Sequence, residues 1–287
     1  MRAPPLVVRL ASVAAAFTLG ACQPPAPPSP RGNVIGSTTV AIDTRMTTVR
    51  VGESAIGDFM TDTLAATVRA MGYEVALALV NAGAIRGGNL APGALPVTID
   101  AKLGKIYPAG ALTDDDVRGW FPFRDDTVVL TVTGAGLKSA LERGAAELPP
   151  DLLDDDGGPL LSLSGGSYTI DCAGQVQIID DDQNIVLREG TRITRLEVGG
   201  VVLWDRDAGV DLLDQTRVQL TVNDFVAEGL DGHAALARAP EEARIPFSQL
   251  DFRDALVAAV AASSPIAPAL ASRITIVGGC GAPLTVP

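Results

Sequence analysis

An asparagine and an arginine stand close together just after an apolar stretch. Residues 81–86 read NAGAIR and follow residues 75–80 (VALALV), whose apolar run predicts a buried strand. Ligands of α/β proteins often bind where strands end. The guanidinium of Arg is shaped to hold phosphate or carboxylate groups. Asn81 and Arg86 therefore predict an anion-binding corner at the end of a strand.

Two phenylalanines stand in places where their rings could serve a ligand. Aromatic residues make up only 4% of the chain, so a ring beside turn residues is informative. Phe123 follows Pro122 and precedes a predicted strand, a position that by itself is typical of a core residue. Phe225 follows another predicted strand and stands in a loop rich in glycine. Two rings on separate loops could stack on both faces of a planar base.

Histidine and clustered aspartates give little support for metal or hydrolytic chemistry. The single histidine, His233, follows Asp231 and Gly232, which favours a local structural role, and no Gly-x-Ser-x-Gly motif is present. The three acidic clusters lack the alternating ligands and closing Glu of a calcium loop. We expect their carboxylates to be solvated; the clusters lie at residues 114–116, 154–156 and 180–182.

The first 32 residues have the pattern of a targeting segment and a tether. Arg2 and Arg9 form a basic start. The apolar run that follows, residues 10–19, is too short to span a bilayer permanently, and small residues precede Cys22. We expect residues 1–21 to be a lipoprotein signal peptide and Cys22 to be lipidated; an ordinary secretory signal is the alternative. Residues 22–32 contain QPPAPPSPR and predict a semi-rigid, Pro-rich tether. Gln23 fits outer-membrane sorting, facing the periplasm, if the cell is Gram-negative.

Charge and cysteine content narrow the class of protein. The formal net charge of the 287 residues is −12, and removal of the two arginines with residues 1–21 lowers it to −14. An acidic surface argues against nucleic-acid binding, and an anionic ligand would need a local basic pocket. Cys172 and Cys280 could pair in an oxidising compartment, and two cysteines without a nearby histidine do not make a zinc site.

Helices and strands are mixed along the remaining chain, which predicts an α+β (mixed α/β) fold. We expect helices at residues 54–71, 114–121 and 137–148, and a further helix capped by Ser248 and running to residue 262. Strands are predicted at 75–80, 127–133, 218–222 and 274–277, with a β-meander over 175–204 and an exposed polar loop at 149–159. The helix at 54–71 should turn one face inward: Ile56, Phe59, Met60, Leu64, Thr67 and Met71.

Five segments together carry a resemblance to a known family. They are residues 53–59 (ESAIGDF), the run 81–86, residues 122–142 with Pro122 and Phe123 at their start, residues 163–165 (LSG) and the loop 223–232 (NDFVAEGLDG). In this order they resemble the C-terminal domain of the 5′-nucleotidase family, which includes bacterial UDP-sugar hydrolases. The likeness spans residues 34–277, and each segment alone is weakly specific.

The resemblance implies a nucleoside-recognition domain within residues 33–287. In the family, two Phe rings hold the base, which corresponds to Phe123 and Phe225, and a loop aspartate binds the ribose hydroxyls, which corresponds to Asp231. These roles suit a π face and a carboxylate.

The same resemblance assigns the polar contacts to three further residues. Asn81 and Arg86 would contact the ligand, and Arg50, three residues before Glu53, would help to hold phosphate. A guanidinium suits that role. The alternative is that these side chains only build the core.

Three positions depart from the family pattern. Asp125 stands where the family usually has Asn, so a carboxylate would change any hydrogen bond to the base edge. Leu230 replaces a glycine of the last loop, and Gly166-Ser167 stands where an arginine is common.

The family's hydrolytic step belongs to a metallophosphatase domain with two metals, whose motifs need several histidines. This sequence contains only His233, so we expect no catalytic residue, metal or cofactor in this chain. Divalent metals would come with a separate metallophosphatase polypeptide.

We therefore expect a lipid-anchored domain that recognises nucleosides or nucleotides in the cell envelope, inactive alone and part of a split hydrolase in nucleotide catabolism. The alternative is an envelope interaction module that kept the fold and lost ligand binding.

Overall fold

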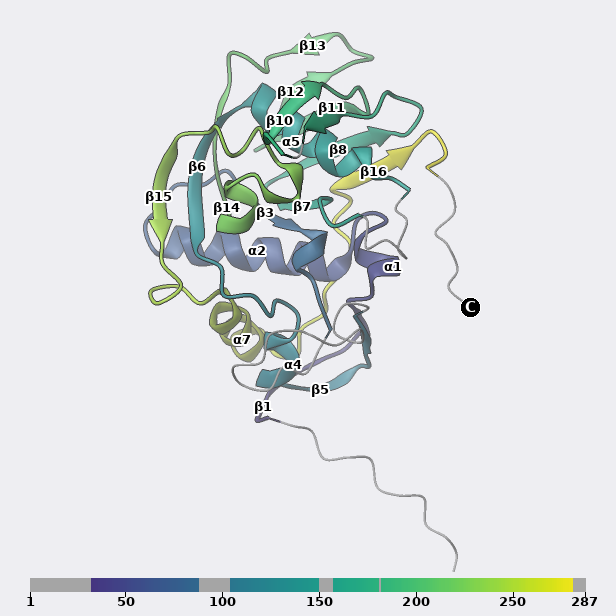
Figure 1. The fold of residues 1–287 in the computed structure, drawn as a ribbon. Helices are drawn as coiled ribbons and strands as arrows, with labels where there is room; N and C mark the ends of the chain where they lie inside the picture. Colours follow the sequence, from purple (N-terminus) through teal and green to yellow (C-terminus); the bar gives the residue numbers. More distant parts are fainter. Residues whose placement is uncertain (1–31, 88–103, 150–156, 181, 281–287) are drawn as a thin grey trace, which may run out of the picture.

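The computed structural model describes residues 32–87, 104–149, 157–180 and 182–280 (Figure 1). The predicted signal peptide, Cys22, nearly all of the tether and the acidic cluster at 154–156 lie outside the described residues. Within them, the larger part of the strands forms two five-stranded sheets, and three two-stranded sheets complete the fold. The mixture of sheets and helices is the α+β arrangement that the sequence predicts.

The central sheet has the strand order β15-β6-β14-β3-β7. β3 and β14 run parallel, and the other neighbouring pairs are antiparallel. Both faces are covered, so β3 is buried along its whole length and reads as a continuous apolar run. The strands are β3 (Leu77–Asn81), β6 (Thr127–Thr133), β7 (Leu161–Ser164), β14 (Arg217–Asn223) and β15 (Glu241–Ile245).

Helices cover one face of the central sheet. α2 (Ala55–Ala70) packs against β3 and β7, and α7 (Phe252–Ser263) packs against α2 and α4 (Asp114–Arg118). The Ser54 hydroxyl accepts from the Gly57 amide and starts α2 as predicted, whereas Met71 lies just after the helix and is exposed rather than turned inward. Ile56, Met60 and Leu64 are buried in this layer.

The last helix begins later than the sequence predicts, and its cap is a different residue. The Asp251 carboxylate accepts from the Arg253 amide and caps α7. Ser248 instead lies in a turn in which the Pro246 carbonyl accepts from the amides of Gln249 and Leu250. The chain therefore turns once more before the helix can start, and the prediction of Ser248 as the cap is wrong.

The second five-stranded sheet and α5 (Gly134–Ala146) cover the other face, opposite α7 and α4 in Figure 1. Its order is β13-β12-β11-β8-β16, and only the β8–β16 pair is parallel. The expected meander is divided: β11 and β12 belong to this sheet, but β9 (Ile178–Asp180) and β10 (Ile185–Arg188) form a separate hairpin. The sheet comprises β8 (Gly166–Asp171), β11 (Ile193–Val198), β12 (Val201–Asp205), β13 (Val210–Asp211) and β16 (Ile274–Val277).

Short elements complete the fold. β1 (Val34–Thr38) pairs with β5 (Gly110–Thr113), and β2 (Ile42–Asp43) pairs with β4 (Ile106–Tyr107). The connections contain α1 (Met46–Val49), η1 (Ala82–Ala84), α6 (Asp224–Ala227) and η2 (Leu230–Gly232). Over the described ranges, the helices are too short or too polar to cross a bilayer.

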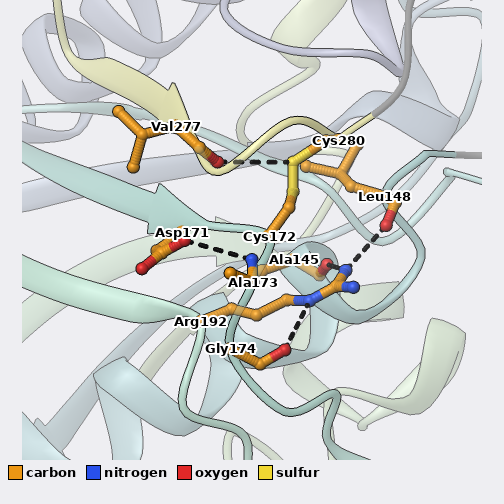
Figure 2. The surroundings of a disulfide bond; sticks show 9 residues. All are labelled: Ala145, Leu148, Asp171, Cys172, Ala173, Gly174, Arg192, Val277 and Cys280. Carbon is orange, nitrogen blue, oxygen red and sulfur yellow. Dashed lines mark hydrogen bonds between the residues drawn. A yellow bond between two sulfur atoms is a disulfide. The ribbon is translucent and has the colours of Figure 1, made fainter.

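A disulfide joins Cys172, just after β8, to Cys280, just after β16 (Figure 2). Because β8 and β16 are parallel neighbours, the residues that follow them leave the sheet side by side, and the two Cα atoms are 5.2 Å apart. The Arg192 guanidinium lies next to the bridge and donates to the carbonyls of Ala145 and Leu148. The bridge therefore ties the end of the described chain to the second sheet.

Candidate functional site

Four strands of the central sheet bring their connecting segments to one edge. β3 and β14 are parallel, so their last residues, Asn81 and Asn223, lie at the same edge. β6 and β7 run the opposite way, and their first residues pair with Asn223 and Asn81 respectively. The segments before β6 and β7 and those after β3 and β14 therefore converge, as strand ends do at ligand sites of α/β sheets.

A pocket of about 260 Å³ opens at this edge. All six residues that the sequence singles out as ligand-binding lie in its lining: Arg50, Asn81, Arg86, Phe123, Phe225 and Asp231. The remaining lining residues are Gly83, Ala84, Asp125, Gly158 and Asn223. Residues distant along the chain thus meet in one cavity.

Asn81 and Asp231 form one polar pair of the pocket. The Asn81 Nδ2 donates to Asp231 Oδ2 over 3.0 Å, and Arg143 donates to the Asp231 backbone carbonyl over 2.8 Å. Burial raises the pKa of the Asp231 carboxyl, while Asn81 and the positive charges of Arg143, Arg50 and Arg86 act to lower it. The positive charges of the site therefore stabilise the ionised form of the Asp231 carboxyl.

Asn223 and Asp125 form a second pair. The Asn223 Nδ2 donates to Asp125 Oδ2 over 2.8 Å. Burial raises the pKa of the Asp125 carboxyl, and the hydrogen bond from Asn223 opposes this rise. The negative charges of Asp224 and Asp126 also raise the pKa of Asp125. The two carboxylates of the pocket thus have different electrostatic surroundings.

The cations come from two loops. Arg50 ends α1 and is almost wholly buried, with 1% of its surface exposed. Arg86 follows η1, and its guanidinium carbon lies 5.7 Å from the centroid of the Phe123 ring, within cation–π range. Arg50 and Arg86 supply positive charge to a protein of net charge −12.

The two pocket phenylalanines are differently supported. Phe123 is half-buried and packs edge-on against Phe121, with ring centroids 6.0 Å apart. Phe225 lies in α6, directly after β14, and is 36% exposed. Phe123 therefore joins the pocket to the core, as its sequence position suggests, whereas Phe225 lies at the exposed rim.

Gly83, Gly158 and Asn223 were not predicted as site residues. A Cβ on Gly83 would lie 3.1 Å from Asn81 Nδ2 and 3.2 Å from the Gly158 Cα, so bulk is excluded there. Asn223 is the last residue of β14, and it reaches the pocket because β14 pairs with β3 in parallel. The sequence of a single strand does not show which strand it pairs with. The loop at 149–159 was expected to be exposed, but residues 157–159 are buried because the Gly158 carbonyl accepts from the Gly83 amide.

His233 lies outside the pocket lining and is wholly buried. Burial, aided by the charge of Arg143, lowers the pKa of its imidazole to about 3, so the ring is neutral near pH 7. A neutral buried ring agrees with the structural role that we expected. No group of three or more His, Cys, Asp or Glu side chains is arranged for a metal in the part of the chain that the structure describes.

Comparison with known proteins agrees with this architecture. The family model of the 5′-nucleotidase C-terminal domain matches residues 34–238. The chain is 26% identical over 210 residues to the trifunctional nucleotide phosphoesterase protein YfkN of Bacillus subtilis, a match that covers 71% of this chain and 11% of that protein. The chain therefore belongs to the 5′-nucleotidase C-terminal domain family.

Solved structures share the fold. A 5′-nucleotidase precursor from Thermus thermophilus superposes with a TM-score of 0.63 at 23% identity, over 85% of this chain and 39% of that one. The NAD nucleotidase of Haemophilus influenzae gives a TM-score of 0.57 at 17% identity, over 85% and 38% of the two chains. The chain thus spans about two fifths of the length of these structures.

Proposed function

We propose that the pocket binds a nucleoside or a nucleotide. The rings of Phe123 and Phe225 would take the two faces of the base, the Asp231 carboxylate would accept hydrogen bonds from the ribose hydroxyls, and Arg50 and Arg86 would hold phosphate. Asn81 would orient Asp231 through their 3.0 Å hydrogen bond and contact the ligand with its carbonyl oxygen.

One observation carries the proposal. Two aromatic rings, a carboxylate and two guanidiniums, drawn from segments between residues 50 and 231, line a single cavity. Each kind of group matches one part of a nucleotide, and a core-only role does not require all of them to face the same space. The alternative of a module that has lost ligand binding predicts that the pocket binds no nucleotide.

Calorimetry with AMP, adenosine and UDP-glucose tests the proposal. We expect binding by the wild-type chain, and a loss of about tenfold or more in affinity for Phe123→Ala and Phe225→Ala, since stacking contributes roughly 1–3 kcal/mol per base. Leu187→Ala is the matched control because Leu187 is an apolar residue, 60% exposed, outside the pocket lining. The proposal fails if none of the ligands binds, or if both Phe variants bind like the control.

We further propose that hydrolysis in nucleotide catabolism requires a separate metallophosphatase polypeptide carrying divalent metals. Two-metal hydrolysis needs a set of ligands that the sequence, with one histidine, does not supply. The purified chain should release no phosphate from AMP with Mg²⁺, Mn²⁺, Co²⁺ or Zn²⁺, and should increase the turnover of an added metallophosphatase from the same cell. Phosphate release by the chain alone, abolished by a chelator, contradicts the split arrangement.

A lipid anchor at Cys22 is the proposal for localisation, in the outer membrane and facing the periplasm if the cell is Gram-negative. It is supported by the basic and apolar segments before Cys22. Metabolic labelling with an alkyne fatty acid should mark the wild-type chain and leave Cys22→Ser unlabelled. Equal labelling of both would rule out Cys22 as the lipidation site.

A further inference from the structure

The Asp125–Asn223 end of the pocket offers hydrogen-bond acceptors without matching donors. An ionised carboxylate can only accept, so the amide of Asn223 turns its Nδ2 toward Asp125 Oδ2, at 2.8 Å. That orientation leaves the Asn223 Oδ1 as an acceptor. This oxygen is buried and has no hydrogen-bond partner among the residues that the structure describes, and its residue is only 9% exposed and lines the pocket.

A buried acceptor without a partner is costly, and such atoms call for an explanation. The Asp125 carboxylate has the same need, because the bond from Asn223 is the only hydrogen bond that it makes among the described residues. Two neighbouring side chains of the pocket lining therefore have acceptor oxygens to spare, and a ligand with two donors close together would satisfy both.

Different charges act on the two carboxyl groups of the pocket. The positive charges of Arg143, Arg50 and Arg86 lower the pKa of Asp231, whereas the carboxylates of Asp224 and Asp126 raise the pKa of Asp125. A phosphate is therefore disfavoured beside Asp125, whose acidic neighbours Asp224 and Asp126 add negative charge. Along the chain, Asp125 stands two residues after Phe123, and Asn223 two residues before Phe225. All four of these side chains line the one pocket, so the two acceptors accompany the rings that would hold the base.

We infer that the pocket selects a guanine base through Asp125 and Asn223. The inference rests on the proposed nucleotide-binding function. Guanine carries two adjacent kinds of donor, N1–H and the exocyclic N2–H₂, which can donate to the Asp125 carboxylate and to the Asn223 Oδ1. Hydrogen bonds to a carboxylate are the stronger, charge-assisted kind.

Other bases fit this end less well. Adenine has one amino donor beside the N1 acceptor, so a lone pair would face the carboxylate and repel it. Hypoxanthine keeps N1–H but lacks the amino group, so it can satisfy one acceptor and not the other. Uracil has a single N3–H between two carbonyl acceptors. A site built of acceptors discriminates against a base that presents acceptors to it, because the acceptors of the site then stay unpaired.

Calorimetry on the full chain with GMP, IMP and AMP tests the inference. We expect GMP to bind roughly 10- to 100-fold more tightly than AMP, with IMP between them, because a hydrogen bond to a charged group contributes about 1.5–3 kcal/mol. In Asp125→Asn the amide can also donate, which accommodates the adenine N1, so the ratio of GMP to AMP affinity should fall by about tenfold or more.

Asp126→Asn is the matched control. Its carboxylate is the next residue along the chain, accepts from the Phe247 amide at 2.7 Å and does not line the pocket. This variant should keep the wild-type preference, and circular dichroism should show that both variants are folded. Nucleotide binding with AMP equal to or tighter than GMP overturns the guanine inference and leaves the proposed function standing. Failure to bind any of the three overturns both.

Discussion

Asp231 has a backbone conformation that few side chains tolerate. Its φ is 56°, in the left-handed region, where Asp and Asn are several-fold more frequent than other non-glycine residues. Gly229, two residues earlier, also has positive φ, at 88°. The loop after β14 therefore turns sharply enough to return the Asp231 carboxylate to the Asn81 amide at the strand edge.

Because of this conformation, different substitutions of Asp231 should affect stability differently while affecting ligand binding alike. Asp231→Ala should unfold more easily than Asp231→Gly, by about 1 kcal/mol, because only Ala is strained at this φ. Both should lose nucleoside affinity alike, since both lack the carboxylate. Urea denaturation and calorimetry on the pair provide the test, and an Ala variant as stable as the Gly variant would exclude strain at this position.

The pocket carboxylate Asp125 predicts a pH-dependent base preference. Its pKa is raised from the usual 3.8 by burial, with Asn223 acting in the opposite direction. As pH falls toward this raised pKa, the carboxyl gains a proton and becomes a donor, so it no longer selects for N–H groups. The ratio of GMP to AMP affinity should decline with acidification, beginning above pH 3.8. Asp125→Asn, which has no proton to gain there, should show a ratio that acidification does not lower.

Among the elements, the start of α2 is held by an unusual pair of acids. The Ala271 amide lies 3.1 Å from Glu53 Oε1 and 2.9 Å from Asp58 Oδ2, so both carboxyl groups approach one N–H. The Arg273 amide donates to Glu53 over 2.8 Å. These contacts fasten the chain before β16 to the helix under the central sheet.

The same pair predicts how stability depends on pH. Burial, and then the hydrogen bond with Glu53, raise the pKa of Asp58 to about 7. A raised pKa means that the folded state binds the proton more tightly than the unfolded state. The stabilisation by the protonated Asp58 is therefore complete below about pH 3.8 and is lost as the pH rises through about 7.

Asp58→Asn should remove this dependence because the amide does not ionise. Relative to the variant, the wild-type free energy of unfolding should fall by on the order of 1–2 kcal/mol as pH rises from acid through neutral. Asp62→Asn, one turn further along α2 at a more exposed carboxylate, is the control. His233 destabilises the fold on acidification, but it is present in all three proteins. A difference in the free energy of unfolding between wild type and Asp58→Asn that stays constant across pH would contradict the raised pKa of Asp58.

At the scale of the whole molecule, the disulfide closes a long loop. Cys172 and Cys280 are separated by 108 residues, and a cross-link of this length restricts the unfolded chain strongly. Reduction should lower the free energy of unfolding by about 2–4 kcal/mol. Neither cysteine lines the pocket, so ligand affinity below the unfolding transition should be retained.

Denaturation with and without reductant measures this effect. The double variant Cys172→Ser, Cys280→Ser should resemble the reduced wild-type protein and be insensitive to reductant. Peptide mapping without reduction should recover the two cysteines in one cross-linked peptide pair. A stability unchanged by reductant would show that the bridge contributes nothing to the fold.

Local sequence was sufficient for most helices and strands of this protein. The Ser54 cap of α2 and the β-branched run of β6 depend on neighbours within a few residues. The prediction of Ser248 as a cap failed because a turn held by the Pro246 carbonyl precedes the helix. The prediction of one meander included the β9–β10 hairpin because the alternation of apolar residues does not indicate which sheet a strand joins.

The sequence by itself determined the types of group in the site and, through the order of its motifs, the family. Only the tertiary structure decided that these groups share a cavity, because pairs such as Asn223 and Asp125 are 98 residues apart and meet through the parallel and antiparallel pairing of β3, β14, β6 and β7. It also decided which acceptors remain unpaired. Hydrogen-bond satisfaction depends on every neighbour in space, and the order of residues along the chain does not contain that information.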